Sequence, residues 1–503
     1  MNLLAKRGSG ILLHPTSLPS IYGIGDLGPA AFAWIDALAR AKQAWWQILP
    51  LGPTGYGDSP YQCFSAFAGN VYLLSPDFLI RDGLLSTRDV AGQYFPDDRV
   101  DYGRVIPFKL SLLRTAWENF RAGQVPTLRE PFEVFCSEHR DWLDDYSLFM
   151  ALKEARRGAS WTQWPRELMR SGGDAKLLEF TRGELTDEMG LYQFGQFLFF
   201  RQWQAVRKHA HERGIRIIGD APIFVAGDSA DVWGNPKQFL LDAAMRPKVV
   251  AGVPPDYFSA TGQLWGNPLY DWKAMRATHY DWWIRRMRAT LSMVDLVRLD
   301  HFRGFCAAWH VPFGESTAVN GKWVDGPGLE LFTSLQSELQ GLPLIAEDLG
   351  EITPDVNELR DRFDLPGMKV LQFAFDGPTN PFLPHNYTTS NWVVYTGTHD
   401  NDTTRGWHAQ IPDHQRWYLG RYLARDGRDI SWDLIRLAWS SSAILAIAPL
   451  QDVLDLGTEA RMNLPGRPDG NWQWRFRLEA FNDHLIHRLA DLTELFGRVA
   501  VHK

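Results

Sequence analysis

The amino-acid sequence predicts an α/β protein, a (β/α)8 TIM barrel with inserted, mainly helical subdomains. Eight short apolar runs recur along the 503 residues. Their hydrophobicity is nearly continuous, which is typical of parallel strands covered on both faces, and segments with helical spacing lie between them. Such strand and helix units build either a closed barrel or an open doubly wound sheet. We expect the barrel because it has eight units, and the open sheet is the alternative.

The predicted strands are the runs 11–13, 45–49, 216–219, 296–299, 344–346, 369–373, 392–395 and 444–447. Before the third run, Phe200, Trp203, Val206 and Ala210 follow one another at nearly helical spacing. Gly214 stands where a glycine ends a helix, so this segment should be the helix that leads into the third strand.

A second helix is expected after the fifth run. Thr353 and Pro354 have the residue types of an N-cap and a first helical position. Val356, Leu359 and Phe363 then recur at helical spacing and predict a buried stripe.

The spacing of the runs predicts the domain organisation. The second and third runs are separated by far more residues than the other neighbouring runs, which indicates an insertion. We expect a helical subdomain over 76–187 and a catalytic barrel formed by 1–75 and 188–503. The segment 250–272 is rich in Gly, Pro and aromatic residues and is expected to be a loop that covers the substrate.

Composition excludes several classes of function. With 52 Lys and Arg against 59 Asp and Glu, the net charge of −7 offers no basic surface for nucleic acid. Three cysteines without C-x-x-C spacing support neither a disulfide framework nor a zinc ribbon and suggest a reducing compartment. No run approaches the about 18 apolar residues that mark a membrane span, and the first residues lack the apolar core of a signal peptide. We therefore expect a soluble cytoplasmic protein without a membrane partner.

Acidic residues follow four of the predicted strands. Asp220, Asp300 and Glu347 come directly after their runs, and Asp400 follows the seventh run by a few residues. In a barrel, the active site lies at the C-terminal ends of the strands. Any one acid could be a helix N-cap, but four acids that converge on one mouth repel one another, which favours a chemical role for the set.

The surroundings of these acids predict different protonation states. Arg298 lies two residues before Asp300, on the same strand face, and its charge would keep Asp300 ionised as a nucleophile. Glu347 follows an apolar strand that would favour the protonated acid. This division between two carboxyl groups is typical of retaining glycoside chemistry. His399, beside Asp400, could bind a substrate hydroxyl or fill the turn.

Longer blocks of sequence resemble a known family. RLDHFRGF (298–305), IAEDLG (345–350) and THDNDT (398–403) are similar to the signature regions of the amylomaltases or disproportionating enzymes, the 4-alpha-glucanotransferases of glycoside hydrolase family 77 in the alpha-amylase clan. The similarity extends in order through GILLHPTSLPS (10–20), LGPTGYGDSPYQ (51–62), GDAPIFV (219–225), GVPPDYFSATGQLWGNPLYDW (252–272) and RMNLPG (461–466). It covers nearly the whole chain.

The resemblance implies an α-amylase-like barrel that needs no cofactor and no metal. It implies transfer of α-1,4-glucan segments from a donor malto-oligosaccharide to the 4-hydroxyl of an acceptor glucan or glucose, by retaining double displacement through a covalent glycosyl-Asp intermediate. The implied substrates are malto-oligosaccharides, amylose and glucans derived from starch or glycogen. The protein is expected to act as a monomer or a simple homo-oligomer.

Positions of this sequence match the family's functional residues. Asp300 matches the nucleophile, Glu347 the acid/base and Asp400 the transition-state stabiliser. The matches to substrate-binding positions are Tyr61, Asp220, Arg298 and His399 around the sugar at the cleavage point, Asp256, Phe258, Gln263 and Trp265 in the loop over the cleft, Asp376 and Asn463 further along the substrate, and Tyr56 at a second glucan site. Cys63 departs from the pattern, because a small hydroxyl residue is expected there.

The sequence leaves three alternatives open. The adjacent pairs Asp300-His301 and His399-Asp400 could mimic a metal phosphohydrolase, although neither has the i, i+4 spacing of a helical metal motif. A non-catalytic glycan-binding scaffold would explain the aromatic residues but not the converging acids. Hydrolysis is the closest alternative, since water can capture the same covalent intermediate that an acceptor sugar would.

Overall fold

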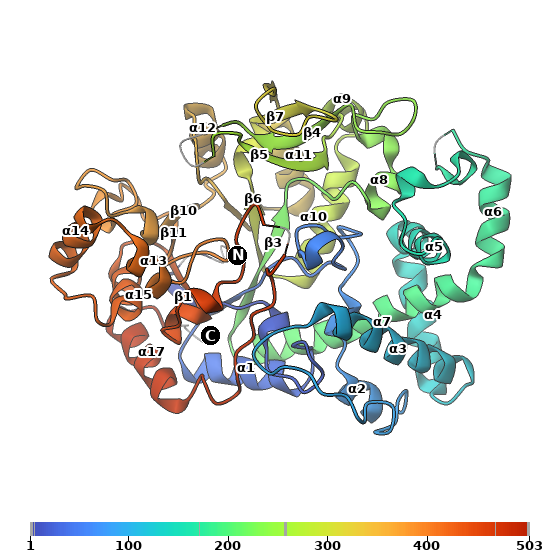
Figure 1. The fold of residues 1–503 in the computed structure, drawn as a ribbon, viewed down its shortest axis with the longest axis horizontal. Coiled ribbons are helices and arrows are strands. Elements are labelled where there is room, and N and C mark those ends of the chain that lie inside the picture. Colours follow the sequence, from blue (N-terminus) through green and yellow to red (C-terminus); the bar gives the residue numbers. More distant parts are fainter. Residues whose placement is uncertain (1–3, 5, 171, 256–258, 468, 500–503) are drawn as a thin grey trace.

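Eight parallel strands form one sheet in the computed structural model, which describes residues 4, 6–170, 172–255, 259–467 and 469–499. The strands are β1 (Gly8–Leu12), β2 (Trp45–Gln47), β3 (Arg216–Pro222), β6 (Leu296–Asp300), β9 (Leu344–Ala346), β10 (Gly367–Val370), β11 (Trp392–Tyr395) and β12 (Leu445–Pro449). Neighbours run in the order β10-β11-β12-β1-β2-β3-β6-β9, and β3 and β6 lie near the centre of Figure 1. Every one of these strands overlaps a predicted run. The largest difference is β10, which begins two residues early and ends at Val370, because residues 371–373 form a 3-10 turn.

The sheet closes into a barrel between its first and last strands, β10 and β9. The N–H of Ala346 donates to the carbonyl of Pro366 at 2.9 Å. The N–H of Met368 donates to Oδ1 of Asp348 at 2.7 Å, so a side chain replaces a ladder bond at this seam. The predicted (β/α)8 barrel is confirmed, and the open sheet is excluded.

Alternation along the strands decides which side chains point into the barrel. Ile218 and Leu296 belong to the inner cluster, whereas their sequence neighbours pack against the surrounding helices. Because side chains on a strand repeat every two residues, Asp220 continues the inward row of β3. Arg298 and Asp300 continue the inward row of β6 in the same way. The apolar pattern that builds the core therefore also aims these polar residues at the barrel mouth.

Helices lie around the barrel and in the segments inserted between its strands. They are α1 (Pro29–Arg40), α2 (Pro76–Arg81), α3 (Tyr102–Arg121), α4 (Arg129–Glu138), α5 (Arg140–Ala155), α6 (Ala175–Glu184), α7 (Thr186–Glu212), α8 (Ala230–Gly234), α9 (Trp272–Ala277), α10 (Asp281–Met293), α11 (Gly328–Leu339), α12 (Pro354–Arg362), α13 (Thr404–Gln410), α14 (Asp413–Leu423), α15 (Ile430–Ser440), α16 (Leu450–Val453) and α17 (Asp483–Leu495). The two predicted helices are present as α7, after which Gly214 has a φ of 73°, and α12. Among the described residues, no helix is both long and apolar enough to cross a membrane.

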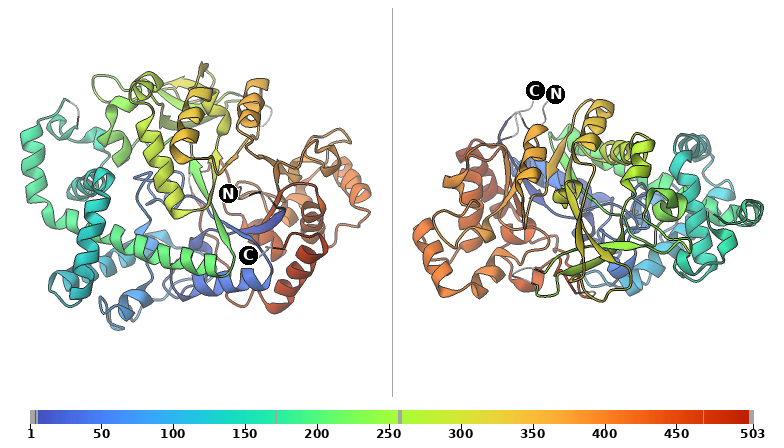
Figure 2. Two further views of the ribbon diagram at one scale, coloured as in Figure 1. Left: turned by 180° about the vertical axis from the view of Figure 1, so that it is seen from behind. Right: turned by 90° about the horizontal axis from the view of Figure 1, so that it is seen from above.

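Helices α2 to α6 occupy the long gap between β2 and β3. Figures 1 and 2 place α3 to α6 together at one side of the barrel. The predicted boundary at residue 188 falls inside α7, which runs without a break from Thr186 to Glu212 and touches both α5 and α1. One continuous helix thus joins the inserted helices to the barrel, and the division into separate domains stays a prediction.

A second, antiparallel sheet stands beside the barrel mouth in the order β5-β4-β7-β8. Its strands are β4 (Val249–Val253), β5 (Gln263–Pro268), β7 (Ala307–Pro312) and β8 (Lys322–Asp325). The segment 250–272, expected as a loop, therefore contains most of a β-hairpin. The hairpin is not predicted from the sequence because glycines and prolines interrupt the apolar pattern of its strands. In addition, β4 pairs on its other edge with β7, which lies more than fifty residues later in the chain.

Candidate active site

Four acidic residues lie at the C-terminal ends of barrel strands, as predicted. Asp220 lies within β3, Asp300 is the last residue of β6 and Glu347 directly follows β9. Asp400 lies in the segment between β11 and α13. Ion pairs, hydrogen bonds and ring contacts join these strand ends into one site.

Arg298 connects two of the acids at the bottom of the site. Its Nη1 lies 2.8 Å from Oδ2 of Asp220, and its Nη2 lies 2.8 Å from Oδ1 of Asp300. Burial opposes the positive charge of Arg298, but Asp220 and Asp300 raise its pKa well above the ordinary value. Burial raises the pKa of Asp220 to about 6, against the influence of Arg298. The Asp300 side chain is 29% exposed and faces the cleft, whereas the side chains of Arg298 and Asp220 are buried.

Glu347 has a different environment. Its Oε2 accepts the N–H of His301 at 2.7 Å, and its Oε1 accepts the N–H of Leu349 at 2.9 Å. His301 has a left-handed backbone, with a φ of 52°, which turns its N–H toward this carboxyl group. Burial raises the pKa of Glu347 to about 8, and the negative charge of Asp300 acts in the same direction. The Arg298 charge and the two backbone hydrogen bonds act the other way and do not cancel this rise. At neutral pH the site therefore contains a carboxyl group that holds its proton beside one that is paired with an arginine.

Residues of the chain after β12 hold Asp400 in place. Its Oδ1 accepts a hydrogen bond from Nδ2 of Asn463 at 2.6 Å and lies 3.3 Å from Nε2 of His399. Nη2 of Arg461 donates to the Asp400 carbonyl at 2.5 Å. The N–H of Asn463 donates to the His399 carbonyl at 3.0 Å. Asn463, predicted from a distant motif, is thus brought directly to Asp400.

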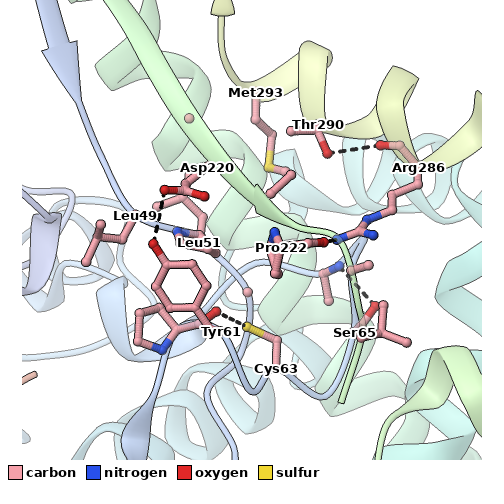
Figure 3. A pocket seen from close by; sticks show the side chains of 18 of the residues that line it. Leu49, Leu51, Tyr61, Cys63, Ser65, Asp220, Pro222, Arg286, Thr290 and Met293 are labelled. Carbon is pink, nitrogen blue, oxygen red and sulfur yellow. Dashed lines mark hydrogen bonds between the residues drawn. The ribbon is translucent and has the colours of Figure 1, made fainter. Parts of the chain in front are cut away.

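Tyr61 contacts both Asp220 and His399 and so connects them. Its hydroxyl donates to Oδ2 of Asp220 at 3.0 Å, as Figure 3 shows. Its ring stacks on His399 with centroids 5.2 Å apart and planes at 15°. Burial, followed by the charge of Asp220, raises the pKa of Tyr61 well above its usual value, so the hydroxyl stays a donor. These contacts hold the Tyr61 ring as a flat surface at the bottom of the site.

Trp472 is a member of this aromatic group that sequence reasoning missed. Its ring packs 5.8 Å from Tyr61 and 6.0 Å from His399. It has a φ of 63°, which is a strained backbone for a large side chain and is typically found where function fixes the geometry. Trp472 lies six residues after the end of the RMNLPG block, and no sequence pattern singles it out.

The hairpin over the cleft contributes Gln263 and Trp265. Nε1 of Trp265 donates to Oε1 of Gln263 at 3.2 Å, and the Trp265 ring meets His301 edge to face at 4.7 Å. This contact brings β5 to the residue that follows Asp300. The predicted loop residues Asp256 and Phe258 lie outside the described residues.

Two predicted positions lie apart from the acids. Asp376 is in the segment after β10, where its Oδ1 accepts from Nδ2 of Asn380 at 2.7 Å. Tyr56 is 78% exposed on a turn after β2. In the described part of the chain, neither forms a hydrogen bond or an ion pair with the four acids.

A small cavity lies behind Tyr61, between β3 and α10 (Figure 3). It measures about 60 Å³ and is lined by residues that include Cys63, Asp220, Arg286 and Met293. Sγ of Cys63 lies 2.8 Å from the Pro60 carbonyl, and burial raises the pKa of this thiol to about 12. Cys63, the departure from the family pattern, therefore stays an uncharged thiol and forms no hydrogen bond with the acids in the described structure.

The pairs that raised the possibility of a metal enzyme have other partners. His301 contacts Trp265, and burial lowers the His301 pKa to about 4. His399 stacks on Tyr61. Within the described ranges, no group of three or more His, Cys, Asp or Glu side chains is arranged to hold a metal ion.

A (β/α)8 barrel with carboxyl groups of contrasting environment at the C-terminal ends of its strands has the architecture of a barrel enzyme, whose active site lies at that end of the barrel. Comparisons with known proteins identify the family. Residues 13–480 match the family model for 4-alpha-glucanotransferase. The chain belongs to the 4-alpha-glucanotransferase family, glycoside hydrolase family 77, and is an enzyme of glucan transfer.

Individual relatives agree with this assignment over their full length. The chain is 53% identical to a 4-alpha-glucanotransferase of Synechocystis sp., with 99% of this chain and 100% of the relative covered. It is 52% identical to a 4-alpha-glucanotransferase of Thermus thermophilus, with 97% and 99% covered. Among solved structures, the amylomaltase from Streptococcus agalactiae in complex with acarbose superposes with a TM-score of 0.94 at 37% identity, covering 98% of this chain and 100% of that one. The family resemblance in the sequence is thereby confirmed.

Proposed function

We propose that the chain transfers α-1,4-glucan segments between malto-oligosaccharides by retaining double displacement, with Asp300 as nucleophile and Glu347 as acid/base. The observation that carries this proposal is the contrast between the two carboxyl groups. Asp300 is paired with the Arg298 guanidinium at 2.8 Å, while burial raises the pKa of Glu347 to about 8. A retaining glycosidase mechanism needs one ionised and one protonated carboxyl group.

In the first step, the Asp300 carboxylate attacks the anomeric carbon of the donor. Glu347 gives its proton to the glycosidic oxygen, the bond between that oxygen and the anomeric carbon breaks, and the shortened chain leaves with a new hydroxyl group. In the second step, the 4-hydroxyl of an acceptor glucan or glucose attacks the same carbon. Its proton passes to the Glu347 carboxylate, the ester to Asp300 breaks, and both carboxyl groups return to their starting states.

The other residues of the site have proposed roles that follow from their contacts. Asp400, with one carboxylate oxygen fixed by Asn463 and near His399, would bind sugar hydroxyls more tightly as the transition state forms. Tyr61, Asp220 and Arg298 would form the floor under the sugar at the cleavage point. The remaining proposed glucan-binding positions are Gln263, Trp265, Asp256, Phe258 and Asp376 along the cleft and the exposed Tyr56 at a second glucan site.

Incubation of the pure protein with maltotriose tests the proposal. We expect glucose, together with maltopentaose and longer chains, and no net loss of glycosidic bonds. Proton NMR of the newly formed linkages should find the α configuration, because two inversions at one carbon give retention. Reducing ends that increase without chain lengthening would instead support hydrolysis, and glucan binding without any product would support a binding scaffold.

The raised pKa of Glu347 predicts how the first step depends on pH. Its proton is required, and it is lost as the pH rises through a pKa of about 8. We therefore expect kcat/KM for maltotriose to fall above this pH by about tenfold per pH unit. A donor whose leaving group needs no proton, such as α-maltotriosyl fluoride, should lack this alkaline fall in the rate of fluoride release. An alkaline fall of equal size with both donors would contradict the assignment of Glu347.

The hairpin residue Trp265 should influence which acceptor captures the intermediate. Its indole touches His301, next to Asp300, so its removal opens the cleft to water beside the ester. We expect Trp265→Ala to raise the ratio of glucose released by hydrolysis to chains lengthened by transfer by about threefold or more. Phe313→Ala, directly after β7 of the same sheet and 53% exposed, is the matched control and should leave the ratio unchanged. A uniform loss of both products in Trp265→Ala would mean that this residue only binds substrate.

A further inference from the structure

The segment that carries His399 and Asp400 is anchored at both ends to one buried side chain, that of Asp452. Asp452 lies in α16, directly after β12, and is 1% exposed. Its Oδ2 accepts the hydroxyl of Thr396 at 2.5 Å and the hydroxyl of Thr404 at 2.8 Å. Its Oδ1 accepts the N–H of Thr404 at 2.7 Å.

The two threonines mark the limits of the segment. Thr396 directly follows β11, and Thr404 is the first residue of α13. Both are fully buried. Between them, Thr398 and Asn401 bond to each other, so the middle of the segment is held as a local turn. The carboxylate of Asp452 thus fixes where that turn leaves the barrel and where it enters the helix.

The chemistry of this carboxylate argues against a role in packing alone. Its three partners are hydroxyl and N–H groups, and no cation pairs with it in the described structure. Burial raises the pKa of Asp452, which reflects the cost of keeping a charge there. A hydrophobic residue would fill the space with less penalty, but it could not accept bonds from both ends of the segment.

We propose that Asp452 is a positioning residue for the transfer reaction, which holds the segment 397–403 so that Asp400 faces the sugar opposite Asp300 and Glu347. The inference rests on the proposed function, because it presupposes a role for Asp400 in the transition state. Asp452 itself touches no substrate. Its removal should let the Asp400 carboxylate move by an amount comparable to a bond length, which is enough to weaken transition-state binding.

The test compares two substitutions at this position. Asp452→Ala should lower kcat for maltotriose about 100-fold, with a smaller change in KM, because misplacement costs mainly transition-state interactions. Asp452→Asn should keep kcat within about threefold of the parent, because its Oδ1 can still accept the Thr404 N–H and the two hydroxyls can turn to accept from its amide. Asp295→Ala is the matched control, since Asp295 also accepts a backbone N–H, that of Ile217 at 2.8 Å, but at the opposite end of the barrel. It should lower the melting temperature without lowering kcat well below that temperature.

A double-mutant cycle separates positioning from general damage. In an Asp400→Asn background, Asp452→Ala should cost less than about threefold further in kcat, because there is no longer a carboxylate to place. Independent losses that multiply, or an Asp452→Ala variant with the parent kcat, would overturn the inference. If Asp452→Ala fails to fold, Thr396→Val replaces it, with about a tenfold expected loss of kcat; an unchanged kcat there overturns the inference as well.

The two proposals fail in different ways. Parent-level kcat in Asp400→Asn alone removes the role of Asp400 and with it the basis of the positioning role, whereas the transfer reaction of Asp300 and Glu347 is tested separately by the products formed from maltotriose. A large loss in Asp400→Asn, together with parent-level kcat in Asp452→Ala, leaves the proposed function standing and rejects only the positioning role of Asp452.

Discussion

Asp300→Asn should lower turnover of maltotriose by at least about 1,000-fold, because the amide cannot form the covalent bond to the sugar. The substitution keeps the shape of the side chain, and the amide oxygen can still accept from Arg298. Folding should be nearly unaffected, since removing one of several neighbouring acids relieves repulsion. Initial rates of product formation, together with the melting temperature, measure both expectations.

The control for this variant is Asp361→Asn. Asp361 is an exposed acid, 66% accessible, that pairs with Arg360 on α12, and it should retain parent activity. Asp300→Asn with a substantial fraction of parent turnover, at a purity that excludes carry-over, would contradict the assignment of Asp300 as nucleophile.

Glu347→Gln should separate the two halves of the reaction. Turnover of maltotriose is expected to fall by about 1,000-fold, because no proton reaches the glycosidic oxygen. The first release of fluoride from α-maltotriosyl fluoride should stay within about tenfold of the parent rate, since fluoride leaves without a proton. The second step still needs a base, so the glycosyl ester on Asp300 should accumulate. Intact-protein mass spectrometry would detect it as an added maltotriosyl group.

Asp300→Asn supplies the matched comparison, because it should release no burst of fluoride and gain no mass. Equal losses with both donors in Glu347→Gln would show that Glu347 supports the site without transferring the proton. An added mass that maps to a peptide without Asp300 would reassign the nucleophile.

The barrel strands and the placement of the acids could be predicted from the sequence because both depend on local pattern. A continuous apolar run identifies a strand covered on both faces. The period of two then puts Arg298 and Asp300 on the inward face that Leu296 begins. The position of Asp220 follows from the same rule. Family resemblance added the residues of distant motifs, such as Asn463, and the structure brings that side chain to 2.6 Å from Asp400.

Features that join distant segments could not be predicted in this way. The antiparallel sheet forms because β4 pairs with β7, and nothing in the segment 250–272 alone specifies that partner. The barrel seam depends on the side chain of Asp348 in place of a ladder bond. The packing of Trp472 on Tyr61 and His399 likewise joins segments that lie far apart in the chain.

The sequence by itself determined the family, the eight strands and which acids point into the barrel mouth. The contrast between Asp300 and Glu347 was also predicted from their sequence neighbours, but only the tertiary structure decided which contacts produce it. Arg298 lies within 2.8 Å of both Asp220 and Asp300, whereas Glu347 is buried and receives two backbone N–H groups. The pKa of a carboxyl group depends on its burial and on the distances to nearby charges. Those quantities arise when separate strands come together, so they belong to the folded barrel rather than to any one segment of the chain.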